Sequence, residues 1–284
     1  MSLEQTGHPG TIREVADQSY VERSPAARLT GLVSSAWIQQ SGDEPYRSRH
    51  VPNGAVELSC ALGSEATVVG PLTEPRVEVL EPGTTIVGLR LHPGAAPSVL
   101  GMPASEVVDL AVDLWDAPAL GEELAGAPSP EHALRDLERH VLERMVGEPD
   151  PLIAEAVKQL MPWHLDDVTS LTTSLYISET QLRRRCRDAV GLAPKTLHRL
   201  LRFQGFLALV QRAIATGRDE SLAQLALDAG YADQSHLNRE CVRLTGVSPL
   251  TFLRETEESC GCGHDHSASY APLLKGRVGA AGEP

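Results

Sequence analysis

The chain has 284 residues, which is enough for about two domains, and its apolar content of 42% supports folded cores. No apolar stretch reaches the roughly 18 residues of a transmembrane helix, and the first residues lack the basic-then-apolar pattern of a signal peptide. The five unevenly spaced cysteines argue against a secreted disulfide scaffold. We therefore expect a cytoplasmic globular protein.

The net charge of −13 is distributed unevenly along the chain. Residues 1–150 carry 10 Lys and Arg against 23 Asp and Glu, a net of −13, whereas residues 151–255 carry 13 against 11, a net of +2. Affinity for the phosphates of nucleic acid depends on local charge. Because an acidic first half would repel DNA, any contact with DNA is expected in the second half.

The first half is predicted to begin with a flexible arm at 1–25 and to continue as a β-rich domain at 26–128. Short strand-like segments separated by Gly and Pro occur between residues 29 and 94. Strands at this close spacing predict a small β-barrel or sandwich. Residues 97–118 are expected to be helical or mixed, with the clearest helix beginning near Pro103.

An amphipathic helix is predicted at 129–147, where Ser129 can cap the helix and Pro130 suits its first position. Its apolar stripe fits two arrangements, namely packing on the β-rich domain of the same chain or packing on the same helix of a second copy in a homodimer. The Gly- and Pro-rich residues 147–151 then mark the best domain boundary. The stripe consists of Leu134, Leu137, Val141 and Met145.

From residue 152 onward the pattern is helical, and its clearest part lies at 221–254. Apolar residues recur there at helical spacing, Gly230 suits the end of that helix, and Asp233 suits the start of the next one. Two short helices with a tight turn between them form a helix-turn-helix. The second helix of such a unit can enter the major groove of DNA.

This unit is the second copy of an internal repeat. The first copy follows a predicted N-cap at Ser178 and contains Leu182-x-Arg184-x-Cys186, and the second contains Leu237-x-Arg239-x-Cys241. Each copy ends in a Gly-x-[Ser/Ala]-Pro sequence, and a long helix joins the two. Two recognition helices held in this way can reach successive major-groove faces, roughly 34 Å apart.

Over residues 152–256 the chain resembles the AraC/XylS family of transcription regulators. The most specific match is Gly230-Tyr231-x-Asp233-Gln234-Ser235-His236-Leu237-x-Arg239, followed by Gly246-x-Ser248-Pro249. The resemblance implies sequence-specific binding to double-stranded DNA, control of transcription and contact with RNA polymerase. It also implies an α+β fold, in which a cupin-like N-terminal sensory domain precedes two helix-turn-helix units joined by a long helix.

The resemblance places the base-reading positions of the family on the two predicted recognition helices. Arg is the residue type that pairs with guanine, and Asn or Gln pairs with adenine. Arg185 and Arg187 are expected to face solvent or phosphate instead. The base-reading positions are Thr180, Gln181, Arg183, Arg184, Gln234, Ser235, His236, Asn238 and Arg239.

Both copies depart from the family at one position, where Cys186 and Cys241 replace the usual Phe. A small buried hydrophobic residue is the simpler interpretation of each cysteine. A thiol switch is the alternative, and it requires an accessible thiol with a lowered pKa.

The first half resembles the sensory domain that one branch of this family carries, which implies a small-molecule effector and often dimerisation. The resemblance fixes no ligand. Polar and aromatic residues within the predicted strands are the candidates for the effector pocket, although each is also a reasonable core or surface residue. The candidates are Trp37, His50, Cys60 and His92.

The tail at 257–284 contains four soft ligands within seven residues, namely Cys260, Cys262, His264 and His266. Thiolate and imidazole ligands suit Zn(II) or Cu(I), so the tail is a candidate metal site and the protein a candidate metal or thiol sensor. The alternative is a flexible polar tail whose Cys and His residues are incidental.

A DNA-repair enzyme with a fused helix-turn-helix module is a further alternative. Alkyl-transfer proteins of this kind carry a reactive Cys in a Pro-Cys-His sequence, which does not occur here. The sequence also contains no Gly-x-Ser-x-Gly elbow and no His-Glu-x-x-His site. We therefore predict a regulator rather than an enzyme.

Overall fold

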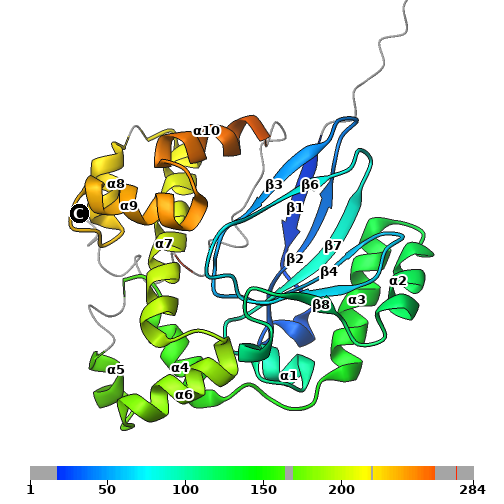
Figure 1. Ribbon diagram of the computed structural model, residues 1–284, viewed down its shortest axis with the longest axis horizontal. Coiled ribbons are helices and arrows are strands. Elements are labelled where there is room, and N and C mark those ends of the chain that lie inside the picture. Colours follow the sequence, from blue (N-terminus) through cyan, green and yellow to red (C-terminus); the bar gives the residue numbers. More distant parts are fainter. Residues whose placement is uncertain (1–17, 164–168, 219, 260–272, 274–284) are drawn as a thin grey trace, which may run out of the picture.

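The computed structural model describes residues 18–163, 169–218, 220–259 and 273. An antiparallel sheet with helices against one face makes up the first half, and a helical second half lies across from the other face (Figure 1). The predicted α+β class is confirmed. None of the described helices is both long and apolar enough to cross a lipid bilayer.

The first half alternates short strands with turns before it becomes helical near residue 117. Its elements are β1 (Ser19–Arg23), η1 (Ala27–Leu29), β2 (Val33–Gln40), β3 (Tyr46–His50), β4 (Glu57–Ala61), β5 (Thr67–Val69), β6 (Arg76–Leu80), β7 (Thr85–Leu91), α1 (Ala96–Leu100), η2 (Ala104–Glu106), β8 (Ala111–Asp113), α2 (Ala117–Ala125) and α3 (Pro130–Arg144).

Six strands form one antiparallel sheet in the order β1-β2-β7-β4-β5-β8, and β3 pairs with β6 in a separate two-stranded sheet. The order begins at β1 and ends at β8, so the described strands form an open sheet. The closed small barrel predicted from the strand spacing is therefore not formed. Instead of bridging the two edges of the large sheet, β3 and β6 pair with each other and extend beside it (Figure 1).

One face of the sheet is the core of the first half, because side chains alternate between the faces of a strand. Leu58 of β4 and Leu89 of β7 are fully buried there, against Leu134 and Leu137 of α3. Burial of each such side chain contributes about 1.5–3 kcal/mol. The apolar stripe of α3 thus packs on its own β-rich domain, and it is not free to form the dimer contact considered as the alternative.

The other face of the sheet is polar and aromatic. Trp37, Glu57 and Arg90 lie on it, opposite the leucines. Trp37 lies over Gly88 of the neighbouring strand, where any Cβ would collide with the indole ring. The glycine therefore makes room for a large ring on the side that faces the second half.

The helix expected to begin near Pro103 is not formed. The segment makes only the single turn η2 and then the strand β8, which pairs with β5. Asp109 separates the two with a φ of 58°, and its carboxylate accepts hydrogen bonds from the backbone N–H and the hydroxyl of Thr73. This local bonding and the pairing with β5 outweigh the helical periodicity of the segment.

Every described element of the second half is a helix. The helices are α4 (Pro151–Leu160), α5 (Thr169–Ser174), α6 (Glu179–Val190), α7 (Pro194–Thr216), α8 (Leu222–Asp228), α9 (Gln234–Thr245) and α10 (Pro249–Ser259).

The residues predicted to begin and end the recognition helices do so. Ser178 and Gln181 form a capping box at the start of α6, and the carboxylate of Asp233 accepts the His236 N–H at 2.6 Å at the start of α9. Gly191 and Gly246 end these helices with φ values of 82° and 80°. Only glycine adopts this conformation without strain.

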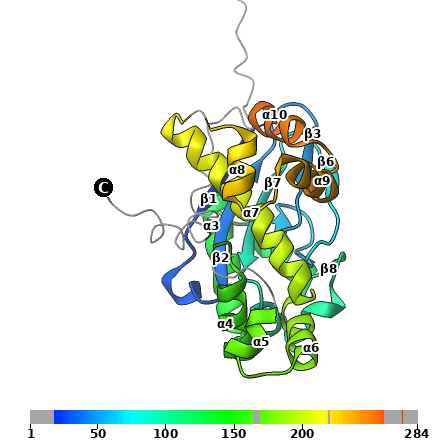
Figure 2. The same cartoon turned by 90° about the vertical axis from the view of Figure 1, so that its left-hand side faces the viewer.

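The long helix α7 organises the second half. Its Phe203 and Phe206 are fully buried and pack with ring centroids 5.8 Å apart. The two helix-turn-helix units lie toward opposite ends of α7 (Figures 1 and 2). A helix of 23 residues is roughly 34 Å long at 1.5 Å per residue, so α7 sets the separation of the units.

Candidate functional site

The first recognition helix, α6, presents its N-terminal half to solvent. Thr180 and Arg184 are exposed and make no side-chain hydrogen bond or ion pair within the described residues. Leu182 and Cys186, on the opposite face, are buried in the helical core. The 3.6-residue period therefore divides α6 into a packed face and a free polar face.

The second recognition helix, α9, repeats this arrangement. Its polar face, from Gln234 and Ser235 to Asn238 and Arg239, is exposed. None of these four side chains has a hydrogen-bond or ion-pair partner in the described part of the chain. Side chains that are free of intramolecular partners can bond to base edges without first breaking a contact.

Three of the nine predicted base-reading residues already contact other residues of the chain. The side-chain oxygen of Gln181 accepts the Ser178 N–H at 3.1 Å, and Arg183 pairs with Glu179 one turn earlier. His236 is only half exposed, because its ring packs edge-on against Tyr231 at 5.2 Å. The geometry therefore favours Thr180 and Arg184 over Gln181 and Arg183 in the first unit.

The two flanking arginines of α6 differ from each other. Arg185 forms a two-pronged ion pair with Asp150, with both N–O distances at 2.8 Å. The same carboxylate caps α4 by accepting the Leu152 N–H, so Arg185 ties α6 to α4 while its side chain stays 40% exposed to solvent. Arg187 is exposed, as expected, and has no side-chain partner among the described residues.

The two cysteines beneath the recognition helices are fully enclosed. Cys186 is 2% exposed and Cys241 is 0% exposed. Burial raises the pKa of the Cys186 thiol to about 12 and also raises the pKa of the Cys241 thiol. Both thiols are therefore protonated and inaccessible at neutral pH, which supports the packing interpretation and not the thiol switch.

The first half holds both helix-turn-helix units at the glycines that end their recognition helices. At the first unit, Gly191 packs so closely on Pro71 and Val108 that a Cβ would come within 2.8 Å of each. At the second unit, Arg49 of β3 donates a 2.6 Å hydrogen bond to the Thr245 carbonyl oxygen, next to Gly246. Both recognition helices thus point their C-terminal ends toward the β-rich domain.

Arg49 makes a second contact, because its guanidinium also pairs with Glu255 of α10 at 2.9 Å. It therefore bridges one strand of the first half to two helices of the second half. We refer to these two bonds, from Arg49 to Thr245 and to Glu255, as the Arg49 bridge.

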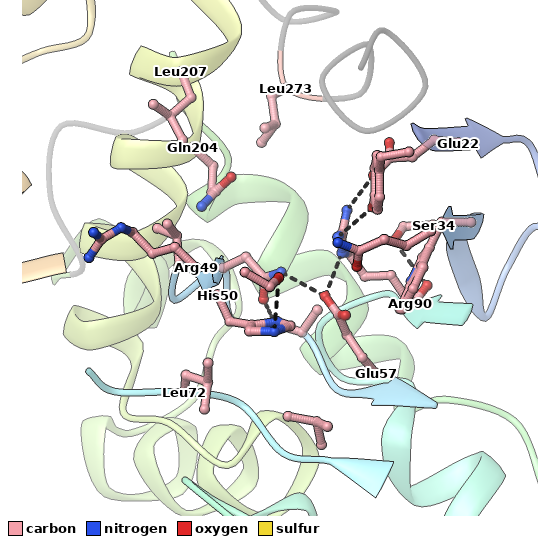
Figure 3. A pocket seen from close by; sticks show the side chains of 18 of the residues that line it. Glu22, Ser34, Arg49, His50, Glu57, Leu72, Arg90, Gln204, Leu207 and Leu273 are labelled. Carbon is pink, nitrogen blue, oxygen red and sulfur yellow. Dashed lines mark hydrogen bonds and ion pairs between the residues drawn. The ribbon is translucent and has the colours of Figure 1, made fainter. Parts of the chain in front are cut away.

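A cavity of about 560 Å³ lies between the polar face of the sheet and the helices of the second half. Its floor comes from β1, β2, β4 and β7, and its roof comes from α4, α7 and α10. Gln204 and Leu207 of α7 face Glu57 and Arg90 across this space (Figure 3). Its volume falls in the range of small-molecule sites, about 300–1,000 Å³.

The floor of the cavity carries a buried charge network. The Arg90 guanidinium bonds to Glu57 Oε1 at 2.8 Å and to Glu22 Oε1 at 3.1 Å, as drawn in Figure 3. Glu22 also accepts the Tyr20 hydroxyl at 2.6 Å, and Glu57 accepts the Asn53 amide at 3.2 Å. One cation is therefore shared between two carboxylates.

Attraction between the opposite charges of this network keeps the Glu57 carboxyl and the Arg90 guanidinium in their charged forms. Burial works to raise the pKa of the Glu57 carboxyl, but the nearby Arg90 guanidinium outweighs burial, so this pKa lies below its usual range. The carboxylates in turn hold the pKa of Arg90 above its usual range despite burial. Glu57 and Arg90 are thus both charged at neutral pH.

The four predicted pocket residues fall in two places. Trp37, His50 and His92 line the cavity, whereas Cys60 lies on the other face of the sheet, buried in the core with a pKa raised to about 11. The sequence analysis missed Glu57 and Arg90. A signal for them exists, because each charged side chain alternates with buried leucines along its strand and therefore belongs to the face opposite the core.

Two family models of known proteins match separate parts of the chain. A family model described as a helix-turn-helix domain matches residues 171–255, which span α6 to α9 and most of α10. A second model, described as a domain of unknown function (DUF6597), matches residues 21–113. No curated protein gives a match.

Residues 171–255 of the chain form a helix-turn-helix domain of the AraC type. The chain is thus an AraC-like DNA-binding transcription regulator, as the resemblance implied. Each of the two units has the Leu and the Cys of a Leu-x-Arg-x-Cys sequence buried and a recognition helix that ends at a glycine. This AraC-type regulator thus has the double architecture inferred from the repeat.

Several solved structures of ToxT from Vibrio cholerae are similar to this regulator at low identity. Apo ToxT has 12% identity and a TM-score of 0.41, covering 84% of this chain and 96% of its own. ToxT bound to (E)-4-(8-methylnaphthalen-1-yl)but-3-enoic acid has 11% identity and a TM-score of 0.42, with 85% and 99% covered. ToxT bound to an unsaturated fatty acid has 11% identity and a TM-score of 0.38, with 84% and 92% covered. Likeness at this level carries no argument about the ligand of this regulator.

The candidate metal ligands Cys260, Cys262, His264 and His266 lie outside the described residues. Within the described residues, no group of three or more His, Cys, Asp or Glu side chains is arranged to hold a metal ion. Metal binding by the tail therefore stays a prediction from the sequence.

Proposed function

We propose that this regulator reads two successive major-groove segments of duplex DNA with the N-terminal halves of α6 and α9. The observation that carries the proposal is the pair of free polar faces held toward opposite ends of α7. The length of α7, roughly 34 Å at 1.5 Å per residue, matches one turn of the duplex, about 34–36 Å. Each helix can therefore meet the same side of the DNA.

In this proposal Arg184 and Arg239 are the principal base readers. They occupy equivalent positions in the two units and have no partner within the described residues. A guanidinium that bonds to a guanine in two places discriminates by about 1–3 kcal/mol. Asn238 is the candidate reader of adenine, and Arg187 is the candidate phosphate contact.

We further propose that a small-molecule effector occupies the cavity between the sheet and the helices. Support comes from the size of the cavity, from its charged floor and mostly apolar roof, and from the participation of both halves in its lining. Arg49 also lines the cavity, so an occupant can act on the Arg49 bridge and thereby on α9. A ligand that fits one arrangement of this bridge better than another shifts the population of DNA-binding molecules.

We propose a regulatory role and not a catalytic one, and the support for it is the match to a helix-turn-helix domain. Contact with RNA polymerase, assembly of a homodimer and a cytoplasmic location stay predictions of the family resemblance. A Zn(II) or Cu(I) site at Cys260–His266 stays a separate proposal, supported only by the spacing of its four soft ligands.

The experiment is a footprint on the promoter region of the protein's own gene, followed by binding titrations of wild type, Arg184→Ala and Arg239→Ala. Each variant is expected to bind about tenfold more weakly, within the range of about 1–3 kcal/mol per base contact. Arg218→Ala is the control, since it removes the same charge from an exposed site outside both recognition helices. Wild-type affinity in both recognition variants would contradict the assigned helices.

A further inference from the structure

The charged groups in and beside the cavity form an alternating row that ends in carboxylates at both sides. Glu78 bonds to His50 at 2.8 Å, and Arg90 lies between Glu57 and Glu22. Arg76 also acts on Glu78 and His50, so the Glu78 end of the row carries no excess of negative charge. At the other end Glu22 and Glu57 share the single Arg90 guanidinium, which leaves an excess of one negative charge at the floor of the cavity.

The remaining charged residues of the lining do not cancel this excess. Arg49 is occupied by the Thr245 carbonyl and by Glu255, and Arg47 is exposed to solvent at the rim. The imidazole of His92 contacts the Thr30 carbonyl oxygen, and burial lowers its pKa. His92 is thus neutral at neutral pH.

Glu57 is the carboxylate that can accept a further hydrogen bond. Its Oε1 accepts both the Arg90 and the Asn53 hydrogen bonds, and its Oε2 has no hydrogen-bond donor within the described residues. Glu57 lines the cavity and its side chain is 17% exposed. This oxygen is therefore free to accept a hydrogen bond from a ligand.

The aromatic pair on the same face of the sheet is also suited to a cation. Tyr20 and Trp37 stack with ring centroids 5.9 Å apart, and both line the cavity. The indole N–H of Trp37 has no partner in the described part of the chain, so it can donate a hydrogen bond to an acceptor elsewhere on the ligand. Aromatic faces attract ammonium and guanidinium groups within about 6 Å.

The roof opposite these groups is mostly apolar, with Gln204 and Gln211 of α7 and Glu255 of α10 as its polar members. Its apolar side chains are Val157 of α4, Met161 at the C-cap of α4, Leu207 and Val210 of α7, and Phe252 of α10. A ligand must therefore combine a charged or strongly donating head with a hydrocarbon or aromatic body.

We propose that the cavity binds an amphipathic organic cation, with an ammonium or amidinium head against Glu57 and an apolar body against α7. This inference rests on the proposed effector site and names the class of its ligand. A carboxylate is disfavoured, because Arg90 is already bonded to two carboxylates and Glu57 would repel an anion.

The test uses the full-length protein and three ligands that differ only in the head group, namely decylamine, decanol and decanoate, each below its aggregation concentration. Isothermal titration is expected to show decylamine binding at least tenfold more tightly than the other two. Tighter binding of decanoate or decanol would overturn the ligand class but leave an effector cavity in place. Binding of none of the three would overturn both the ligand class and the effector site.

Variants locate the cation. Glu57→Gln keeps the shape of the side chain and is expected to weaken decylamine binding at least tenfold while leaving decanol unchanged. Glu78→Gln is the matched control, because it removes the same charge from a half-exposed site that does not line the cavity. An equal loss in both variants would indicate general attraction of a cation to an acidic protein and would overturn the proposal.

A second variant keeps the test decisive if Glu57→Gln does not fold. Gln211 lies on α7, half-buried, and lines the cavity, so Gln211→Trp fills part of the space without changing the charge network. Decylamine binding is expected to fall at least tenfold in this variant. Unchanged binding would place the ligand outside the cavity. The DNA-binding titrations are independent of each of these outcomes.

Discussion

Arg49 of β3 donates a 2.6 Å hydrogen bond to the carbonyl oxygen of Thr245, the last residue of α9. A strand of the acidic first half thus satisfies a carbonyl that the helix itself cannot, since the last four carbonyls of a helix have no intrahelical partner. The bond joins the sheet domain directly to the second recognition helix. In the proposed mechanism it is one contact through which a change in the first half reaches the DNA-binding surface.

The first prediction concerns this contact. Arg49→Met is expected to lower the free energy of unfolding by about 2 kcal/mol, because hydrogen bonds to charged groups contribute about 1.5–3 kcal/mol. The ion pair with Glu255 adds little to this free energy, because the Glu255 side chain is partly exposed to solvent. Urea unfolding measures the loss, and hydrogen exchange is expected to increase in α9 and α10.

Arg47→Met is the control for Arg49→Met. Arg47 lies on the same strand, is exposed, and has no hydrogen-bond or ion-pair partner among the residues described. Equal stability losses in the two variants would show that the Arg49 bridge contributes nothing specific.

The second prediction separates phosphate contact from structural support on α6. Arg187→Ala is expected to weaken binding to all DNA sequences alike and to reduce the slope of log K against log salt by about 1. Arg185→Ala instead removes the ion pair with Asp150, so it should lower stability and leave the salt slope unchanged. A reduced slope in Arg185→Ala would mean that Arg185 leaves Asp150 to contact DNA.

The third prediction is a pH dependence. Burial raises the pKa of the Cys186 thiol from 9.0 to about 12, so above pH 9 the unfolded chain loses this proton while the folded chain keeps it. The contribution of Cys186 to stability is therefore constant below about pH 9 and falls between about pH 9 and pH 12. The expected fall approaches about 1.4 kcal/mol per pH unit.

The measurement compares urea unfolding of wild type and Cys186→Ala at pH 8 and pH 10, since other groups titrate equally in both proteins. The stability difference between the proteins should shrink at pH 10. In parallel, a thiol reagent should label Cys186 only as fast as the protein unfolds. Rapid labelling of the folded protein would restore the thiol-switch hypothesis.

The fourth prediction concerns the tail. Full-length protein is expected to bind Zn(II) or Cu(I) with a dissociation constant below micromolar, and Cys260→Ser with Cys262→Ser should abolish this binding. Cys60→Ser is the control, because that thiol is buried in the core of the sheet domain. Binding weaker than micromolar in the wild type, or equal binding in all variants, would refute a metal site in the tail.

The sequence predicted the helical half well because its signals are local. Capping at Ser178 and Asp233 and termination at Gly191 and Gly246 depend on residues within one turn of each helix. The repeat then located the recognition faces, because a period of 3.6 residues assigns each side chain to a face. All of this information is contained in short stretches of chain.

The features that sequence analysis missed depend on distant partners. Arg49 and Thr245 are 196 residues apart, and no local pattern connects them. The turn and strand near Asp109 replaced a predicted helix, because pairing with β5 outweighed local periodicity. The prediction of Cys60 as a pocket residue is wrong because the sequence does not define the register of its strand. A shift of one residue in register moves a side chain to the other face of a sheet.

The packing of Gly191 and Gly246 against the sheet domain fixes more than the position of two helix ends. Together with α7, which joins the two units, this packing fixes the angle between the two recognition helices. The protein should therefore bind only an operator whose two half-sites have the matching rotation about the DNA axis. One inserted base pair between the two half-sites rotates one relative to the other by about 35°, given 10–10.5 base pairs per turn. A regulator built in this way should tolerate sequence changes between its half-sites far better than changes in their spacing.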